Sequence, residues 1–212
     1  MMLATNVLTT TYVEEKLDFI EKSKENLGHL MVDIESMGNK SFGSVVSIGA
    51  VEFDMNTGET GREFYETITL QSCLDIGLNV NGSTVAWWLM QSEAARKEIA
   101  EATFSISKAL YDFRMFLQKL NPSELCIWGN SARFDLGLLE NAYQSIQQRE
   151  VPWNFRNERD VRTLVAFAPE IKQKYKDIPV ETLIPNGVLH HPITDCKLQI
   201  MYCVDIWNKL SL

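Results

Sequence analysis

The sequence has few cysteines and histidines and no long apolar run. Its 212 residues include four cysteines and three histidines. The cysteines are widely spaced, form no C-x-x-C pair and lie in apolar runs, which disfavours both a disulfide framework and a zinc site. There is no stretch of about 20 apolar residues, and the N-terminus has no basic segment followed by an apolar core. We therefore expect a soluble cytoplasmic protein with no membrane segment.

The chain also lacks a basic excess. The formal net charge is -8, which argues against holding nucleic acid by bulk electrostatics, because neutralising phosphates normally takes a basic surface. The positive charges are nevertheless unevenly distributed, and most arginines and several lysines fall in one part of the chain. A local basic rim and an ordinary mixed-charge surface are both compatible with this cluster, which consists of Arg133, Arg149, Arg156, Arg159, Arg162, Lys172, Lys174 and Lys176.

Hydrophobic periodicity predicts one α/β domain with a mixed sheet. Three strands are expected at residues 29–36, 44–54 and 62–70, with a turn over 54–61, where Asn, Thr and Gly residues suit a hairpin loop. Residues 83–120 have helical spacing with Ser83 or Thr84 as N-cap, and a fourth strand is expected over 124–130. Further helices are expected at 134–148, after a strand end within 159–170, and at 192–210. Three antiparallel strands followed by alternating helix and strand describe a sheet flanked by helices.

Carboxylates occur at the ends of the predicted strands and at the starts of helices. Asp33 and Glu35 are two residues apart on a strand, so both side chains emerge on one face. Asp135 follows the fourth strand, and Asp195 lies near the start of the last helix. Each could be a surface acid or a helix cap, but together they could converge on one spot. Oxygen-only ligands with open positions favour Mg²⁺ or Mn²⁺ over zinc.

Three motifs of this chain resemble those of the DEDDh 3′-to-5′ exonucleases, a family with the ribonuclease H-like fold. VDIES matches the D-x-E motif, NSARFD the second motif and HHPITDC the H-x-x-x-x-D motif, in the family's order. The resemblance covers residues 29–210. The patterns VDIESMGN, SIGAVEFD, WWLMQS, WGN and RDVRTL are most similar to the branch of phage exonuclease A proteins and mycobacterial-type 3′-to-5′ exoribonucleases. It implies a ribonuclease H-like domain over residues 28–212, after a polar, helical N-terminal extension over 1–27.

The resemblance also implies a mechanism. Two divalent cations, Mg²⁺ or Mn²⁺, would be held by Asp33, Glu35, Asp135 and Asp195. Of the adjacent histidines, the family spacing selects His190 as the general base. Nearby carboxylates are expected to raise its pKa toward operating pH. The enzyme would hydrolyse the 3′ end of single-stranded or 3′-overhang nucleic acid and release nucleoside 5′-monophosphates.

Several further residues are candidates for substrate contact. Each also has a structural interpretation: Trp88 as core or dimer contact rather than base stacking, Arg159 and Arg162 as internal ion pairs rather than phosphate ligands, and Phe134 as packing beneath a metal ligand. Many proofreading members have asparagine where this chain has Ser131, so that contact does not transfer directly. The candidates are Met37, Gly38, Trp88, Asn130, Phe134, Arg159 and Arg162.

Two other functions remain open at this point. A catalytically idle nucleic-acid-binding module would be favoured by a missing ligand, and no ligand is missing. A two-metal nucleotide phosphohydrolase would use the same acids. The sequence does not separate DNA from RNA, because that choice depends on contact with a 2′-hydroxyl. Relatives of this branch suggest a homodimer in a bacterial cytoplasm, or in the host cytoplasm for a phage-encoded protein.

Overall fold

The computed structural model describes residues 27–147 and 150–211. The predicted helix of the N-terminal extension lies outside these residues. Within them, a mixed five-stranded sheet has the order β3-β2-β1-β4-β5. β1 pairs antiparallel with β2, and β2 with β3, whereas β4 is parallel to both β1 and β5. The strands are β1 (His29–Ser36), β2 (Val45–Phe53), β3 (Thr60–Thr67), β4 (Cys126–Gly129) and β5 (Glu158–Asp160). The predicted mixed sheet is confirmed.

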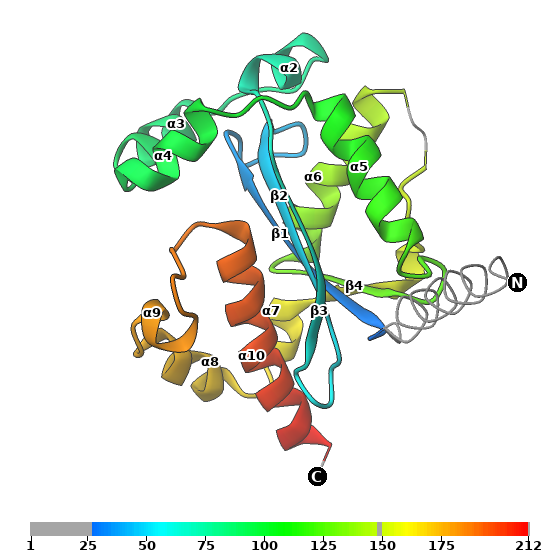
Figure 1. The fold of residues 1–212 in the computed structure, drawn as a ribbon, viewed down its shortest axis with the longest axis vertical. Helices are drawn as coiled ribbons and strands as arrows, with labels where there is room; N and C mark the ends of the chain where they lie inside the picture. The colour runs from blue at the N-terminus through cyan, green and yellow to red at the C-terminus, as the bar shows by residue number, and fades with distance from the viewer. Residues whose placement is uncertain (1–26, 148–149, 212) are drawn as a thin grey trace, which may run out of the picture.

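Helices cover both faces of this sheet (Figure 1). One core lies between the sheet and α5 and α6, and a second lies between the sheet and α7, α8 and α10. The α-helices are α2 (Leu70–Asp75), α3 (Gly82–Leu89), α4 (Glu93–Ala100), α5 (Ile106–Gln118), α6 (Ala132–Ser145), α7 (Val161–Val165), α8 (Pro169–Lys176), α9 (Val180–Leu183) and α10 (Pro192–Leu210), with a 3-10 turn at Phe155–Asn157. No helix in the described ranges has the length and apolar character needed to span a bilayer.

Two local predictions are wrong. The third strand was expected to continue to Leu70, but β3 ends at Thr67 and Leu70 begins α2. The helix expected to start after Ser83 or Thr84 is instead capped by Asn81, whose side chain accepts hydrogen bonds from the N–H groups of both residues. Asparagine is among the best capping residues because its short side chain reaches the free N–H groups of the first turn. The region of helical spacing is divided among α3, α4 and α5.

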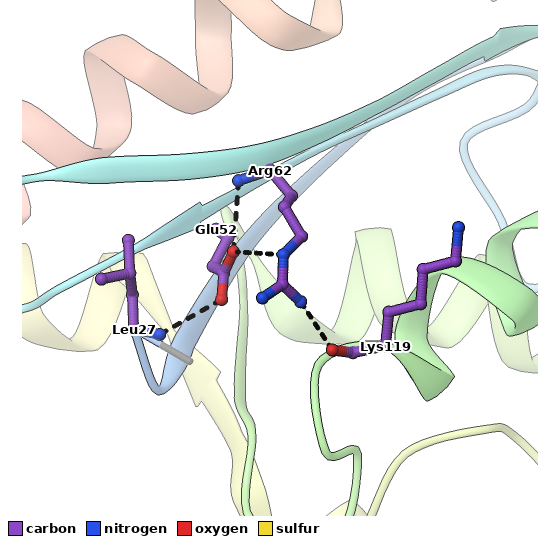
Figure 2. A network of polar contacts seen from close by, with 4 residues as sticks. All are labelled: Leu27, Glu52, Arg62 and Lys119. Atoms are coloured by element: carbon purple, nitrogen blue, oxygen red, sulfur yellow. Dashed lines mark hydrogen bonds and ion pairs between the residues drawn. The ribbon is translucent and has the colours of Figure 1, made fainter. Parts of the chain in front are cut away.

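A buried glutamate, Glu52, links the segment before β1 to β2 and β3. Glu52 is 2% exposed, and its carboxylate accepts hydrogen bonds from the N–H groups of Leu27 and Arg62, both at 3.1 Å. The Arg62 guanidinium lies beside it, 3.6 Å away, and donates in turn to the carbonyl of Lys119 (Figure 2). This carboxylate is therefore compensated by a cation and by N–H donors, as a buried charge requires.

Gly49 allows α10 to reach the sheet directly opposite Asp33. The two residues are register partners across β1 and β2. A Cβ on Gly49 would lie 2.4 Å from Cβ of Pro192, the first residue of α10. The Cys196 thiol also contacts the backbone here, 3.5 Å from the carbonyl oxygen of Met31. The absent side chain thus sets how closely the start of α10, which carries Asp195, approaches β1.

We expect Gly49→Ala to lower the stability of the protein. The new methyl group must displace the start of α10, and overpacking of this kind costs roughly 1–3 kcal/mol. The free energy of unfolding from urea denaturation measures the effect. Gly82→Ala is the matched control, since a Cβ there meets nothing within 4 Å. An unchanged free energy of unfolding in Gly49→Ala would contradict the close approach.

Candidate active site

Asp33 and Glu35 project from the same face of β1, as predicted from their spacing. The strand ends one residue later, with a register irregularity between Glu35 and Ser36. Asp33 Oδ1 accepts a hydrogen bond of 2.8 Å from Gln199 Nε2 on α10. Burial, followed by the charges of Asp135, Asp195 and Glu35, raises the pKa of Asp33 well above its usual value. Burial and the neighbouring acids also raise the pKa of Glu35, to about 8.

Asp135 reaches the same place from the first turn of α6. The chain leaves β4 at Gly129 and enters the helix at Ala132. Asp135 therefore lies close enough to β1 for its charge to act on Asp33. Its side chain is only 3% exposed, and its Oδ2 atom has no hydrogen-bond partner. Burial raises the pKa of Asp135 to about 7, while nearby backbone N–H groups of Asn130 and Ile34 offset part of the increase. The Ser131 side chain makes no cap hydrogen bond.

Asp195 and His190 complete the cluster from the start of α10. Ligand atoms of Glu35, His190 and Asp195 all lie within 4.8 Å of one another. Burial raises the pKa of Asp195 to about 6. These four acids come from three separate segments, and the charges of Glu35, Asp135 and Asp195 all act on Asp33. The structure therefore brings all four predicted acids and the predicted histidine together.

The environment of His190 differs from expectation in one respect. Burial lowers the pKa of His190, so the predicted increase caused by nearby carboxylates is wrong. The lower pKa keeps the imidazole neutral near pH 7, which is the form able to accept a proton. The ring lies edge-on to Trp87 on α3, with 5.0 Å between ring centroids. The adjacent His191 contacts other groups: its ring lies 4.5 Å from that of Tyr65, and its Nε2 lies 3.8 Å from Glu98 Oε1.

The structure separates the two adjacent tryptophans. Trp88 is 4% exposed and donates a 3.0 Å hydrogen bond to the Ser36 carbonyl. It packs in a small core with Met37, so its indole is not open for base stacking. Trp87, which borders His190, is the exposed member of the pair. Sequence analysis did not assign a role to Trp87, because only the docking of α3 reveals which of the two rings faces the site.

The other substrate candidates have mixed positions. Main-chain N–H and carbonyl groups of Met37 already pair with Ser44 and Asn81, and the Gly38 carbonyl accepts from the Ser36 hydroxyl. Phe134 packs partly on the main core and also lines a cavity of about 570 Å³ between α6 and the loop after β1.

The basic candidates Arg159 and Arg162 lie on either side of Asp160 in the sequence. Arg159 donates to the carbonyls of Arg156 and Glu158. It makes no ion pair with any described residue, so the first of its two interpretations, an internal ion pair, is not supported. Asp160 caps α7 through the N–H of Thr163 and accepts from the N–H of Ala132 at the start of α6. Arg162 is exposed on α7.

Gln199 is a site residue that the sequence analysis did not identify. It is four residues after Asp195, so both lie on one face of α10. The i, i+4 spacing from a predicted ligand was the available signal, but glutamine has no charge to draw attention to it. Its hydrogen bond to Asp33 orients that carboxylate.

The fold and the cluster of acids define a nuclease of the DEDDh class. Residues 28–207 match the family model described as the Rv2179c-like 3′-5′ exoribonuclease domain, and the chain belongs to this family. A curated relative, the exodeoxyribonuclease of Enterobacteria phage T4, is 25% identical, with the match covering 81% of this chain and 85% of the relative. The protein is therefore a member of a 3′-5′ exonuclease family that acts on nucleic acid.

Solved structures with the same fold have lower sequence identity. The Mg²⁺- and Mn²⁺-bound form of S. pombe Pop2p matches with a TM-score of 0.57 and 14% identity over 92% of this chain and 89% of that one. The nuclease domain of 3′hExo, a DEDDh member bound to rAMP, matches with a TM-score of 0.53 and 11% identity over 85% and 92%. Exonuclease X, solved with 5′-overhanging duplex DNA, matches with a TM-score of 0.52 and 16% identity over 87% and 93%. These similarities show the ribonuclease H-like fold.

Proposed function

We propose that this protein is a metal-dependent exonuclease that removes nucleoside 5′-monophosphates from the 3′ end of single-stranded or 3′-overhang nucleic acid. The observation that carries the proposal is the meeting of four carboxylates, none of which makes an ion pair with any residue that the structure describes. Glu52 has Arg62 and N–H donors, whereas Asp135 Oδ2 is buried without a partner. Like charges gathered in this way raise one another's pKa values and call for a cation.

The residues fit two divalent cations. Their donor set is rich in carboxylate oxygens, which suits Mg²⁺ or Mn²⁺. Asp33 and Glu35 on one strand, with Asp135 and Asp195 on facing helices, would hold the ions. When bound, they would lower the pKa of the attacking water and neutralise charge on the phosphate. This contribution is needed because a positioned general base supplies only ~10²–10⁴-fold in rate, far below the ~10¹⁷-fold that phosphodiester hydrolysis can demand.

In this proposal His190 acts as the general base. A ring nitrogen of the neutral imidazole accepts a proton from the water that attacks the terminal phosphorus. The bond from phosphorus to the 3′-oxygen of the preceding nucleotide breaks as the new P–O bond forms. The leaving 3′-oxygen takes up a proton from solvent water. The products are a nucleoside 5′-monophosphate and a strand shorter by one nucleotide, which ends in a 3′-hydroxyl. Gln199 holds Asp33 in orientation during this step, and Trp87 limits rotation of the His190 ring.

The 570 Å³ cavity beside Phe134 is our candidate for the pocket of the 3′-terminal nucleotide, which is released. Lys40 and Arg133 line it, so positive charges are available to backbone phosphates.

We further propose that the protein works in a reducing cytoplasm, bacterial or of a phage-infected host, which agrees with its four free cysteines. A homodimer stays a prediction, for which sedimentation velocity is the direct measurement.

A degradation panel tests the proposed function. Matched single-stranded and duplex DNA and RNA, labelled at the 5′ end, would be incubated with Mg²⁺, Mn²⁺ or a chelator. We expect a ladder shortened from the 3′ end, mononucleotide products, and no cleavage with the chelator. Removal of a terminal phosphate alone would support the phosphohydrolase, and binding without cleavage would support the idle module. The panel also determines the preference between DNA and RNA.

Divalent cations should stabilise the protein more at high pH than at low pH. Because the pKa values of Glu35, Asp135 and Asp195 are raised to about 8, 7 and 6, the folded state binds more protons than the unfolded state between about pH 4 and 8. The free energy of unfolding without metal therefore falls as pH rises through this range. Cations compete with those protons, and a cation at about 100 times its Kd adds about 2.7 kcal/mol.

Thermal denaturation at pH 5.5 and pH 8, with and without Mn²⁺, measures this effect. We expect a clearly larger rise of Tm at pH 8. Equal shifts at the two pH values, or no shift at pH 8, would contradict the assignment of these carboxylates as ligands. Zn²⁺ is left out of the test because free thiols could bind it.

A further inference from the structure

Two lysines face the carboxylate cluster across a second cavity. This cavity, of about 260 Å³, lies between α8 and the start of α10. Asp33, Asp195 and Gln199 line it together with Lys172, Tyr175 and Lys176 of α8. A group bound in this cavity would therefore lie beside both the carboxylate cluster and the ammonium groups.

The two lysines have no acidic partner among the residues that the structure describes. Their i, i+4 spacing places both on the same face of α8. The hydroxyl of Tyr175 donates to Asp205 Oδ2 at 2.7 Å, which fastens α8 to α10. Lys172 Nζ lies 5.3 Å from the ring centre of Tyr202. Within the described part of the chain, neither lysine makes an ion pair or a hydrogen bond.

His190 does not line this cavity. Asp33, Asp195 and Asn130 border it, but Glu35 and His190 do not, although both of these lie close to Asp195. Burial raises the pKa of Asp135 and lowers the pKa of Lys172. The charge of Arg162 lowers both pKa values by a smaller amount.

The geometry of phosphoryl transfer indicates which part of the substrate lies in this cavity. In an in-line displacement the attacking and leaving oxygens lie on opposite sides of the phosphorus. Since His190 deprotonates the attacking water on its own side, the leaving 3′-oxygen departs on the other side. That oxygen belongs to the strand that remains, so this strand extends toward the cavity.

We propose that Lys172 and Lys176 bind backbone phosphates of the retained strand, on the 5′ side of the scissile bond. This inference rests on the proposed function. It explains how a chain of net charge -8 can hold a polyanion, since two local ammonium groups supply the attraction that the bulk surface does not. It also gives a use to the basic segment after β5, whose role the sequence left open.

Two substrates of different length provide the test. An oligonucleotide carries retained-strand phosphates, whereas the 4-nitrophenyl ester of thymidine 5′-monophosphate has the scissile bond but no nucleotide on that side. Lys172→Ala and Lys176→Ala should each lower kcat/KM for the oligonucleotide, mainly through KM, by about tenfold more than for the ester. Lys174→Ala is the matched control, because it removes the same charge from the opposite face of α8.

Binding provides a second measurement that does not depend on turnover. In an Asp135→Asn background, the slope of log Kd against log salt should become shallower by about 0.7 for each lysine removed, the value for a phosphate contact to single-stranded nucleic acid. Equal losses on both substrates would overturn the proposal and show that the lysines only balance the acids. An unchanged oligonucleotide KM and salt slope would overturn it too. A wild-type protein that cleaves neither substrate would instead sink the proposed function.

Discussion

Asp135→Asn is expected to reduce cleavage by at least about 10³-fold while leaving the fold intact. The substitution keeps the size of the side chain but removes one of four carboxylates, and the loss of metal-borne charge stabilisation costs several kcal/mol, at about 1.4 kcal/mol for each tenfold in rate. Initial rates on a 5′-labelled oligonucleotide measure the loss. Circular dichroism and Tm report on the fold.

A second prediction concerns the Tm of Asp135→Asn in the absence of metal. Asp135 is buried with an unpartnered oxygen and a raised pKa, so neutralising it should leave Tm in chelator equal to or above that of the wild type at pH 8. The rise of Tm with Mn²⁺ should shrink. Asp75→Asn, an exposed acid on α2, controls for the change of net charge. Turnover retained in Asp135→Asn would refute the ligand assignment.

His190→Ala should lower kcat by about 10²–10⁴-fold, the usual contribution of a positioned general base. The rise of Tm with Mn²⁺ and the affinity for oligonucleotide should change little, because the carboxylates remain. His191→Ala is the informative comparison, since the two histidines are neighbours in sequence but contact different groups. His191 faces Tyr65 and Glu98, so its loss should cost less than about tenfold. The reverse order of effects would transfer the role of base to His191.

The pattern of residues was sufficient to predict the strands of the sheet and the shared face of the first two acids. Alternating or continuous apolar runs mark β1, β2 and β4, and the period of two places Asp33 and Glu35 on one face regardless of what packs against them. Helix α10 was also predictable over its full length, because Pro192 marks its start and its apolar residues keep the helical period. Errors occurred where tertiary contact or a short side chain decides a boundary, as at Asn81 and Leu70.

The environment of each site residue was not predictable in the same way. A sequence shows that His190 has acids nearby in the chain, but the direction of its pKa shift depends on how α3 and α10 enclose it. Similarly, adjacent tryptophans look equivalent until docking of α3 buries Trp88 and leaves Trp87 beside the site.

The sequence by itself determined the set of candidate ligands and the order of elements, since residue type and local periodicity carry that information. Only the tertiary structure decided which groups compensate one another. Glu52 pairs with a guanidinium. The four site acids make no ion pair within residues 27–147 and 150–211, and Lys172 and Lys176 line a cavity together with two of them. Charge compensation depends on distances between segments far apart in the chain, and these distances are set by packing of helices on the sheet rather than by local pattern.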